Sequence, residues 1–141
     1  MNKKQFLRSL NDVYCRLAPS KNGVGVFAVR DIPKGTDPFK NCDNSGYVLK
    51  VSENDLEAAS APEAAKKMVR DFCALQDGIY FVPSYGIDAI DKSFFLNHSK
   101  KPNMIPRKRG EIFVTARGIK KGEELTANYD AYHHTKHFRR R

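Results

Sequence analysis

An apolar run that ends abruptly in polar side chains is the feature that most constrains how this chain can fold. Phe94, Phe95 and Leu96 are followed at once by Asn97 and His98. Such a run is typical of an element that leaves the core and delivers polar groups to an interior site. The Asn amide and the imidazole can together satisfy several polar atoms of a ligand. The alternative is a turn in which both side chains bond their own backbone.

Length and composition limit the class of protein. A chain of 141 residues has room for one modest domain with a core. No apolar stretch is long enough to span a membrane, and residues 1–5 lead into an amphipathic segment rather than a signal peptide. We therefore expect a soluble intracellular protein of the cytoplasm or nucleus, not secreted, as a monomer or homodimer. The three cysteines Cys15, Cys42 and Cys73 are widely spaced, which favours neither a disulfide framework nor a cysteine-zinc site.

Positive charge is concentrated in the last third of the chain. Residues 1–99 carry 13 Lys and Arg against 12 Asp and Glu, whereas residues 100–141 carry 12 against 4. The basic clusters are 100–101, 107–109 and 139–141. They favour contact with an acidic partner surface or a nucleic-acid backbone, and a solvated face with a frayed tail is the alternative.

Hydrophobic spacing predicts a short helix and a strand in the first third of the chain. Phe6, Leu7, Leu10 and Tyr14 recur at helical spacing, so we expect a helix over 3–13 that docks one side on the domain. Residues 24–32 are β-branched and aromatic and predict a strand. The segment 30–35 recurs as 117–122, each copy following an apolar strand and ending in glycine. Two such units suggest sheets folded against each other.

The middle of the chain is the only strongly helical region. Ser52 and Asp55 resemble a capping box, and Pro62 suits a first helical position. The core face of this helix is predicted to carry Ala65, Met68, Val69, Phe72 and Leu75, before Gly78 ends it. Short strands are expected at 79–82, near 87–90 and at 112–116.

Three stretches read together resemble a known family. Residues 97–103, Asn-His-Ser-Lys-Lys-Pro-Asn, resemble the first signature of the SET-domain protein lysine methyltransferases, and 122–129, Gly-Glu-Glu-Leu-Thr-Ala-Asn-Tyr, resemble the second. Residues 20–28 look like the family's opening glycine strand. The resemblance implies a mainly β protein with a short helical insert, the SET-domain β-clip fold of small folded sheets. It divides the chain into an N-terminal helix (1–13), a SET domain (14–130, insert about 52–76) and a basic tail (131–141).

The same resemblance implies a site and a reaction. The implied activity is methyl transfer from S-adenosylmethionine, leaving S-adenosylhomocysteine, to a lysine of a histone or another basic protein. Tyr129 matches the family's catalytic tyrosine. The cofactor-binding positions implied are Gly23, Val24, Gly25, Asn97, His98 and Tyr129, and the substrate-channel candidates are Tyr80, Phe81, Tyr85, Phe95 and Ala127. The competing hypothesis is a catalytically idle module of the same fold that binds nucleic acid or chromatin through its basic half.

The chain departs from the family pattern at several positions. The Cys common after Asn-His-Ser is Lys100, the carboxylate common before the last tyrosine is Asn128, and the cysteine cluster that binds zinc in many relatives is missing. The tail must then cover the adenine, with Tyr132 or Phe138 as the stacking residue. Three histidines at 133, 134 and 137 have spacing that suits a metal, but without a fourth ligand we expect none.

The residue two before the last tyrosine often decides how many methyl groups family members add. Here it is Ala127, where a tyrosine would hold a water and restrict the amine. Its small side chain leaves space beside the amine, so the expected product is di- or trimethyllysine. Tyr80 or Tyr85 swinging into this space is the alternative.

Overall fold

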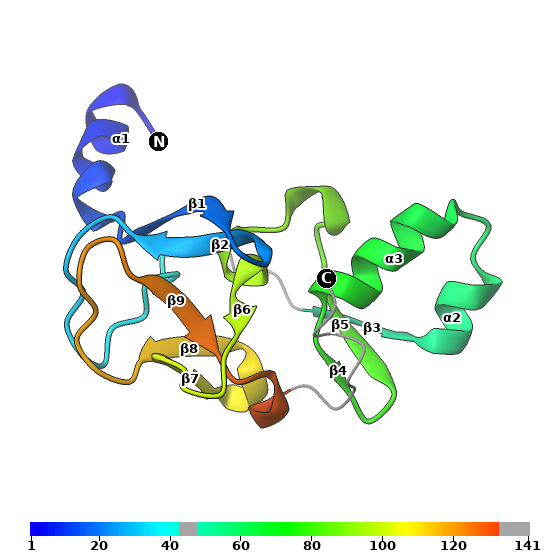
Figure 1. Cartoon of the computed structure of the whole chain (residues 1–141). Coiled ribbons are helices and arrows are strands. Elements are labelled where there is room, and N and C mark those ends of the chain that lie inside the picture. The colour runs from blue at the N-terminus through cyan, green and yellow to red at the C-terminus, as the bar shows by residue number, and fades with distance from the viewer. Residues whose placement is uncertain (43–47, 133–141) are drawn as a thin grey trace.

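Three small β-sheets form the framework of the chain in a computed structural model, which describes residues 1–42 and 48–132 (Figure 1). The four-stranded sheet has the order β1-β2-β9-β6, and the three-stranded sheet has the order β3-β5-β4. Strands β7 and β8 pair alone. The bounds are β1 Cys15–Ser20, β2 Gly23–Ala28, β3 Val48–Ser52, β4 Leu75–Gln76, β5 Ile79–Pro83, β6 Asn97–His98, β7 Met104–Arg107, β8 Ile112–Thr115 and β9 Glu124–Ala127. The expected mainly β fold of small sheets is confirmed.

The four-stranded sheet brings the three motif-bearing segments together. Strands β1 and β2 form an antiparallel hairpin, and β2 pairs antiparallel with β9. On its other edge β9 pairs parallel with the two-residue strand β6, which places Asn97 opposite Thr126 and His98 opposite Ala127. Parallel neighbours need a long connection, and here 25 residues separate the end of β6 from the start of β9. The site is therefore assembled from segments far apart in sequence.

The two copies of the repeated turn lie against each other. Ile32 and Ile119 form an antiparallel bridge in which each backbone N–H donates to the other's carbonyl at 2.8 Å. Both side chains are 1 % exposed. Lys121 N–H also donates to the Asp31 carboxylate at 2.9 Å. The repeat predicted sheets folded against each other, and the bridge joins the end of the β2 segment to the approach to β9.

The helical insert contains α2 (Glu53–Ala58) and α3 (Glu63–Phe72), which lie beside the three-stranded sheet (Figure 1). The capping box is confirmed, since Ser52 Oγ accepts from Asp55 N–H and the Asp55 carboxylate accepts from Ser52 N–H. Pro62 is the N-cap rather than the first helical residue. The prediction that the helix continues to Leu75 was wrong, because α3 ends at Phe72 and Leu75 pairs with Tyr80 in a hairpin turned by Asp77 and Gly78, both at positive φ.

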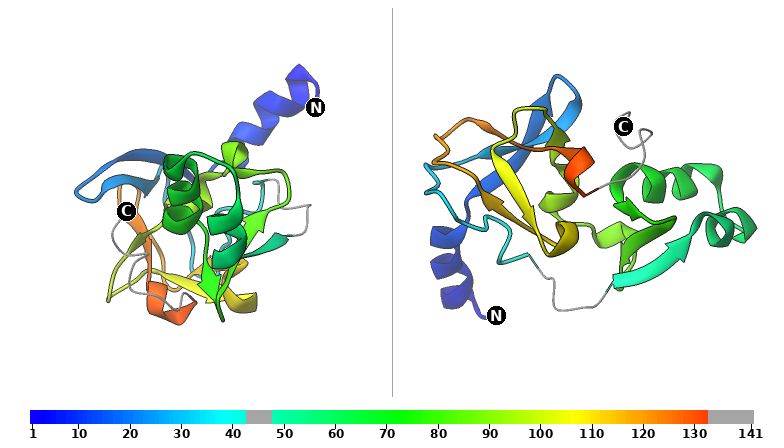
Figure 2. Two further views of the ribbon diagram at one scale, coloured as in Figure 1. Left: turned by 90° about the vertical axis from the view of Figure 1, so that its right-hand side faces the viewer. Right: turned by 90° about the horizontal axis from the view of Figure 1, so that it is seen from below.

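Two other local predictions were also wrong. Residues 87–90 form a 3₁₀ turn, η2 (Ile87–Ala89), instead of a strand, following Gly86 at φ 96°. The N-terminal segment is helical in α1 (Lys3–Ser9) and η1 (Leu10–Asp12), but it does not dock: Phe6, Leu7 and Leu10 are 51 %, 56 % and 52 % exposed. Figures 1 and 2 show α1 standing away from the sheets. The remaining 3₁₀ turns are η3 (Lys92–Phe95), η4 (Lys108–Gly110) and η5 (Tyr129–Ala131).

Two hydrophobic clusters support these sheets. The larger one lies among the four-stranded sheet, the Ile32–Ile119 bridge and the β7–β8 pair, and it contains Val26, Leu96, Leu125 and Ala127. The smaller one joins the insert helices to β5 and contains Leu56, Cys73, Tyr80 and Val82. Strand β5 alternates, so Tyr80 and Val82 face the helices while Phe81 and Pro83 face a cavity between the insert and the rest of the fold.

Candidate functional site

Asn97 is a buried polar residue held by a hydrogen-bond network. Its side chain is on β6, the residue is 5 % exposed, and its Nδ2 donates to the Glu124 Oε2 at 2.8 Å and to the Val24 carbonyl at 3.2 Å. Buried polar groups are costly unless paired, and these bonds satisfy the amide nitrogen. They also fix the amide plane. Within the part of the chain that the structure describes, Asn97 Oδ1 accepts no hydrogen bond, so the acceptor side of a fixed amide remains for a ligand.

The Glu124 carboxylate is bound on both oxygens. Oε1 accepts from Ser20 Oγ at 3.0 Å, and Oε2 accepts from Asn97. The carboxylate occupies the space above Gly25, where a Cβ would lie 2.4 Å from Oε2. The three segments that carry the sequence motifs therefore meet at one polar cluster, made by Ser20 and Gly25 of the hairpin, Asn97 of β6 and Glu124 of β9.

His98 and Tyr129 form a second contact between the same segments. His98 Nδ1 accepts from Tyr129 N–H at 3.1 Å, and the two rings lie 5.1 Å apart. Because Nδ1 is the acceptor, a neutral His98 carries its proton on Nε2. Tyr129 is 2 % exposed, and its hydroxyl donates to the Leu96 carbonyl at 2.5 Å. The end of the apolar run therefore positions the tyrosine as well as the two polar side chains.

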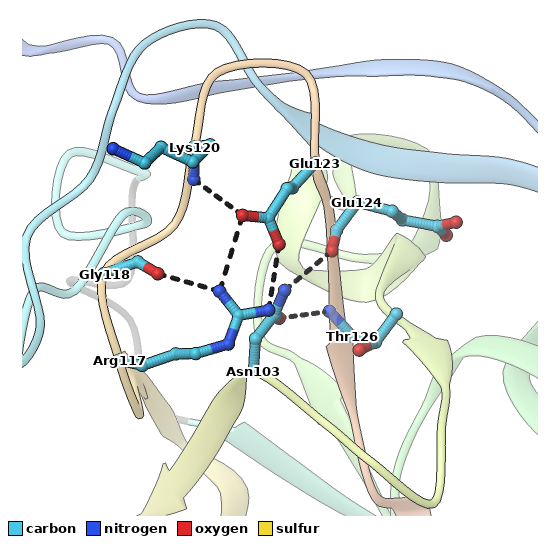
Figure 3. Close-up of polar contacts among 7 residues, drawn as sticks. All are labelled: Asn103, Arg117, Gly118, Lys120, Glu123, Glu124 and Thr126. Atoms are coloured by element: carbon cyan, nitrogen blue, oxygen red, sulfur yellow. Dashed lines mark hydrogen bonds and ion pairs between the residues drawn. The ribbon is translucent and has the colours of Figure 1, made fainter.

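Asn103 fastens the end of the first signature to β9 (Figure 3). Its Nδ2 donates to the Glu124 carbonyl and its Oδ1 accepts from Thr126 N–H, both at 2.8 Å. Asn103 is 4 % exposed, so its amide substitutes for a missing backbone partner inside the fold. The residues between His98 and Asn103 are thus held as a loop over the strand.

The two adjacent glutamates of the second signature have different roles. Glu123 faces the turn before β9, where it pairs with Arg117 at 2.9 Å and accepts from Lys120 N–H at 2.8 Å (Figure 3). The Arg117 guanidinium and this N–H lower the pKa of the Glu123 carboxyl. Glu124 points the other way, into the polar cluster. Glu123 therefore shapes the turn, whereas Glu124 positions Asn97.

A cavity of about 860 Å³ lies beside this assembly. Its walls come from β5, η3, η4, β8 and the insert, and they include Leu96, whose carbonyl holds the Tyr129 hydroxyl. Tyr132 also lines it. That residue is buried, packs edge-on against Phe113 at 5.1 Å, and lies 6.0 Å from Tyr129 ring to ring. Tyr129 is not among the described lining residues, but Leu96 and Tyr132, which both contact it, are.

The structure divides the expected channel residues. Phe81 and Tyr85 line the cavity. Tyr80 points to the insert helices, where burial, with the nearby Glu53 carboxylate, raises its pKa to about 12. Phe95 packs on Phe72 at 5.1 Å and against the larger core, and Ala127 is fully buried in that core. Two of the five candidates thus line the cavity, and three lie in its supporting core.

The expected cofactor residues are mostly together. Gly23, Val24 and Gly25 begin β2, and the Val24 carbonyl accepts from Asn97. Gly23 has φ 101°, and a Cβ there would meet no atom within 4 Å, so that side of the strand is open. Tyr132 lies on the cavity wall, where its carbonyl accepts from the buried Gln76 at 2.7 Å. Phe138 and the three tail histidines lie outside the described residues.

Asn128 takes the position of the carboxylate that the family usually carries. Its side chain caps η5, where Oδ1 accepts from Asp130 N–H at 3.0 Å. The substitution therefore exchanges an ion-pairing group for a turn-capping group just before Tyr129. Among residues 1–42 and 48–132, no three His, Cys, Asp or Glu side chains are grouped to hold a metal ion.

Comparison with known proteins establishes the family. A family model of the SET domain matches residues 23–130 of this 141-residue chain, so the chain belongs to the SET-domain family. The family is generally associated with protein lysine methyltransferase activity. A search of curated proteins gave no significant match. None of the described helices has the length and apolar character needed to cross a membrane.

Sequence reasoning missed the contributions of Glu124 and Ser20. Glu124 lies in the second signature, but its sequence position alone does not indicate that it, and not Glu123, faces the site. The alternation of β9 is the signal that could have found it, since Leu125 and Ala127 face the core and Glu124 faces away from them toward the hairpin. Ser20 ends β1, a strand that the sequence analysis did not predict.

Proposed function

We propose that this protein is an S-adenosylmethionine-dependent protein lysine methyltransferase. The observation that carries the proposal is the parallel β6–β9 pair, which joins Asn97 to Glu124 and His98 to Tyr129 beside a cavity. This pair brings fixed polar side chains together with a buried tyrosine hydroxyl.

The chemical groups around Asn97 fit the cofactor's amino-acid end. That end presents an ammonium and a carboxylate, and S-adenosylmethionine supplies an electrophilic methyl group on its sulfonium. The unpaired Asn97 Oδ1 suits a cationic donor, and the space beside the nearby Gly23 is open. His98 would contribute from its Nε2 side, and Tyr132 or Phe138 would cover the adenine.

The target amine has to arrive without its proton. With a reference pKa near 10.4, leaving a lysine neutral at pH 7 costs about 4.6 kcal/mol. A dry channel favours the neutral amine, and the aromatic lining residues Phe81 and Phe113 would favour it where they contact the side chain. Alignment of the amine by the channel contributes the rest of the acceleration.

Tyr129 is proposed to orient the amine at the end of the channel. Its hydroxyl is anchored on the Leu96 carbonyl, and its backbone is anchored on His98, so neither can rotate freely. A phenol has a reference pKa near 10, so at neutral pH it acts as a hydrogen-bonding group rather than a full base. We therefore assign it a positioning hydrogen bond close to the reacting atoms.

Isothermal titration of the full chain with S-adenosylmethionine tests the proposal. The wild type is expected to bind, and both Asn97→Ala and His98→Ala are expected to bind much more weakly. A radiolabelled methyl-transfer assay on histones and cell lysate then tests turnover. Absence of cofactor binding by a folded wild type would overturn the proposal. Binding without any transfer would favour the idle module instead.

The second candidate is contact with nucleic acid or another acidic surface. Lys100, Lys101, Arg107 and Lys108 are all exposed. Such a surface attracts polyanions without needing a catalytic site. A gel-shift titration with nucleic acid compares the wild type with a variant in which these four residues are changed to Ser. If the second candidate is right, the variant should lose nucleic-acid binding and should still bind S-adenosylmethionine.

A further inference from the structure

Three lysines from three separate segments converge on the opening of the 860 Å³ cavity. Lys40 follows the buried Phe39, Lys50 lies on β3, and Lys108 begins η4. All three are exposed, so they form the rim of the cavity rather than its walls. We call this set the lysine rim. The inference drawn from it rests on the proposed function.

Acidic residues of the cavity lining offset the lysine rim only in part. Of the described residues that line the cavity, only Asp37 and Glu111 are acidic. The Asp37 carboxylate is turned to the backbone, where it accepts from Phe39 N–H at 2.8 Å. Within the described residues, none of the three lysines forms an ion pair. With three lysines against these two carboxylates, the described lining carries one net positive charge.

Lys108 is held at the rim by an unfavourable backbone conformation. Its φ is 48°, in the left-handed region that residues other than glycine rarely adopt. The η4 turn is held by close packing of Gly110 on Tyr132. A Cβ added at Gly110 would lie 3.0 Å from the Tyr132 Cβ. Strained positions of this kind persist where the surrounding structure enforces them, and they cluster at functional sites.

The rest of the cavity lining is less polar than the lysine rim. The lining includes the aromatic residues Phe81 and Phe113 as well as Leu96, which holds the Tyr129 hydroxyl. A target lysine that inserts its side chain into this cavity leaves the neighbouring residues of its own chain at the opening. Those flanking residues are then the ones that meet Lys40, Lys50 and Lys108.

We propose that the lysine rim selects target lysines that are flanked by aspartate or glutamate. Carboxylates at the opening would gain from opposite charge, whereas arginine or lysine flanks would meet like charge. This substrate class differs from the basic histone tail that the family resemblance suggests. A peptide is a better occupant than nucleic acid, because the lining includes the aromatic residues Phe81 and Phe113, which an inserted side chain can contact.

A peptide-binding measurement tests the preference for acidic flanking residues and does not depend on turnover. Short fluorescein-labelled peptides carrying one central lysine, flanked by Asp and Glu, by Ser, or by Arg, are titrated with the full chain, and fluorescence anisotropy is followed. Each exposed charge pair contributes modestly, so the three together should make the acidic peptide bind at least about fivefold more tightly than the serine peptide. About 0.5 M salt should reduce this difference.

The triple variant K40E/K50E/K108E should reverse the order and prefer the arginine peptide. The matched control K3E/K4E/K34E has the same change in net charge, on exposed lysines that do not line the cavity, and should keep the acidic preference. Circular dichroism establishes that both variants are folded.

Three results would overturn the inference. The acidic and serine peptides could bind equally, both triple variants could lose the preference together, or a DNA oligonucleotide of equal charge could compete as well as the acidic peptide. Failure of the proposed function looks different, because it removes cofactor binding. A wild type that binds cofactor and methylates all three peptides at equal rates would leave the proposed function standing and remove the charge selection.

Discussion

The Glu124 carboxylate fills the space that a side chain on Gly25 would need. A Cβ at Gly25 would lie 2.4 Å from Glu124 Oε2 and 3.1 Å from Asn97 Nδ2. The glycine is therefore required less for backbone freedom than for the approach of β9 to the hairpin. The closeness of these two residues is what allows one carboxylate to reach both Ser20 and Asn97.

Gly25→Ala should consequently disturb the Asn97 amide. The added methyl group must displace the carboxylate, and overpacking of this kind costs about 1–3 kcal/mol. We expect a lower free energy of unfolding in urea and at least about tenfold weaker S-adenosylmethionine binding, which is about 1.4 kcal/mol. Gly118→Ala is the control, because its Cβ meets nothing nearer than the Ile32 carbonyl oxygen at 3.9 Å. Unchanged cofactor affinity in a folded Gly25→Ala protein would contradict the role given to this cluster.

Tyr129→Phe should separate turnover from cofactor affinity. The phenylalanine keeps the ring contacts with His98 and Tyr132 but loses the hydroxyl bound to Leu96. We expect turnover to fall at least about tenfold, equivalent to about 1.4 kcal/mol of barrier, while cofactor affinity changes much less. Loss of the buried hydrogen bond should also lower stability by about 1 kcal/mol.

The control for that variant is Tyr14→Phe. Tyr14 packs under the Arg30 guanidinium at 5.1 Å and lies before β1, outside the three motif segments. It should keep wild-type turnover. If Tyr129→Phe turns over at the wild-type rate, Tyr129 does not orient the amine.

Some features could be predicted because the sequence carries them locally. The capping box needs only Ser52 and Asp55, and the buried Asn97 follows from an apolar run that ends in polar residues. The strand at 79–82 and the strand at 112–116 have local β patterns that the fold keeps. The three motifs also predicted which segments would meet at the site.

Other features depend on partners that local patterns do not reveal. Phe6, Leu7 and Leu10 have helical spacing, but no surface of the described fold covers them. Leu75 fits the helical pattern of α3, yet its pairing with Tyr80 across the hairpin prevails. Glu124 resembles its neighbour Glu123 until the pairing of β9 sends them to opposite sides. The presence or absence of a tertiary partner decided each of these cases.

The cysteines should be poorly reactive in the native protein. Burial raises the pKa of Cys15, and it raises the pKa of Cys73 to about 12. For Cys42, burial together with the nearby Asp91 carboxylate raises the pKa to about 11. Only the thiolate reacts readily, so Ellman's reagent at about pH 8 should label the native protein slowly, the half-buried Cys42 first, and all three thiols at once in denaturant.

Because of these raised pKa values, the free energy of unfolding should fall as the pH rises above 9. The folded state holds the thiol protons more tightly than the unfolded chain, whose thiols titrate near pH 9. The contribution of the protonated thiols to folded-state stability is therefore present below pH 9 and is lost as the pH rises toward 11–12. Urea unfolding should show lower stability at pH 10.5 than at pH 7.5, with a smaller fall in Cys73→Ala. A Cys73 thiol that reacts as fast in the native as in the denatured protein would contradict its burial.

The number of methyl groups added should depend on the space beside Tyr129. A methylated amine must rotate and shed a water before it can present its lone pair again, so free volume favours repeated transfer. Ala127 supplies a small side chain there, two residues before the tyrosine, although it is itself fully buried in the larger core. On this basis the expected product is di- or trimethyllysine.

Tyr80 and Tyr85 are the two residues that could fill this space, and their positions in the fold distinguish them. Tyr80 packs with Leu56 and Cys73 against the insert helices, whereas Tyr85 is 42 % exposed and lines the cavity. If the wild type stops at one methyl group with cofactor still in excess, Tyr85 is the residue to change. Tyr85→Ala should then advance the product to dimethyllysine in mass spectra of a fully turned-over substrate, and Tyr80→Phe should not. A monomethyl product in both variants would mean that the space beside Ala127 is closed by the core itself.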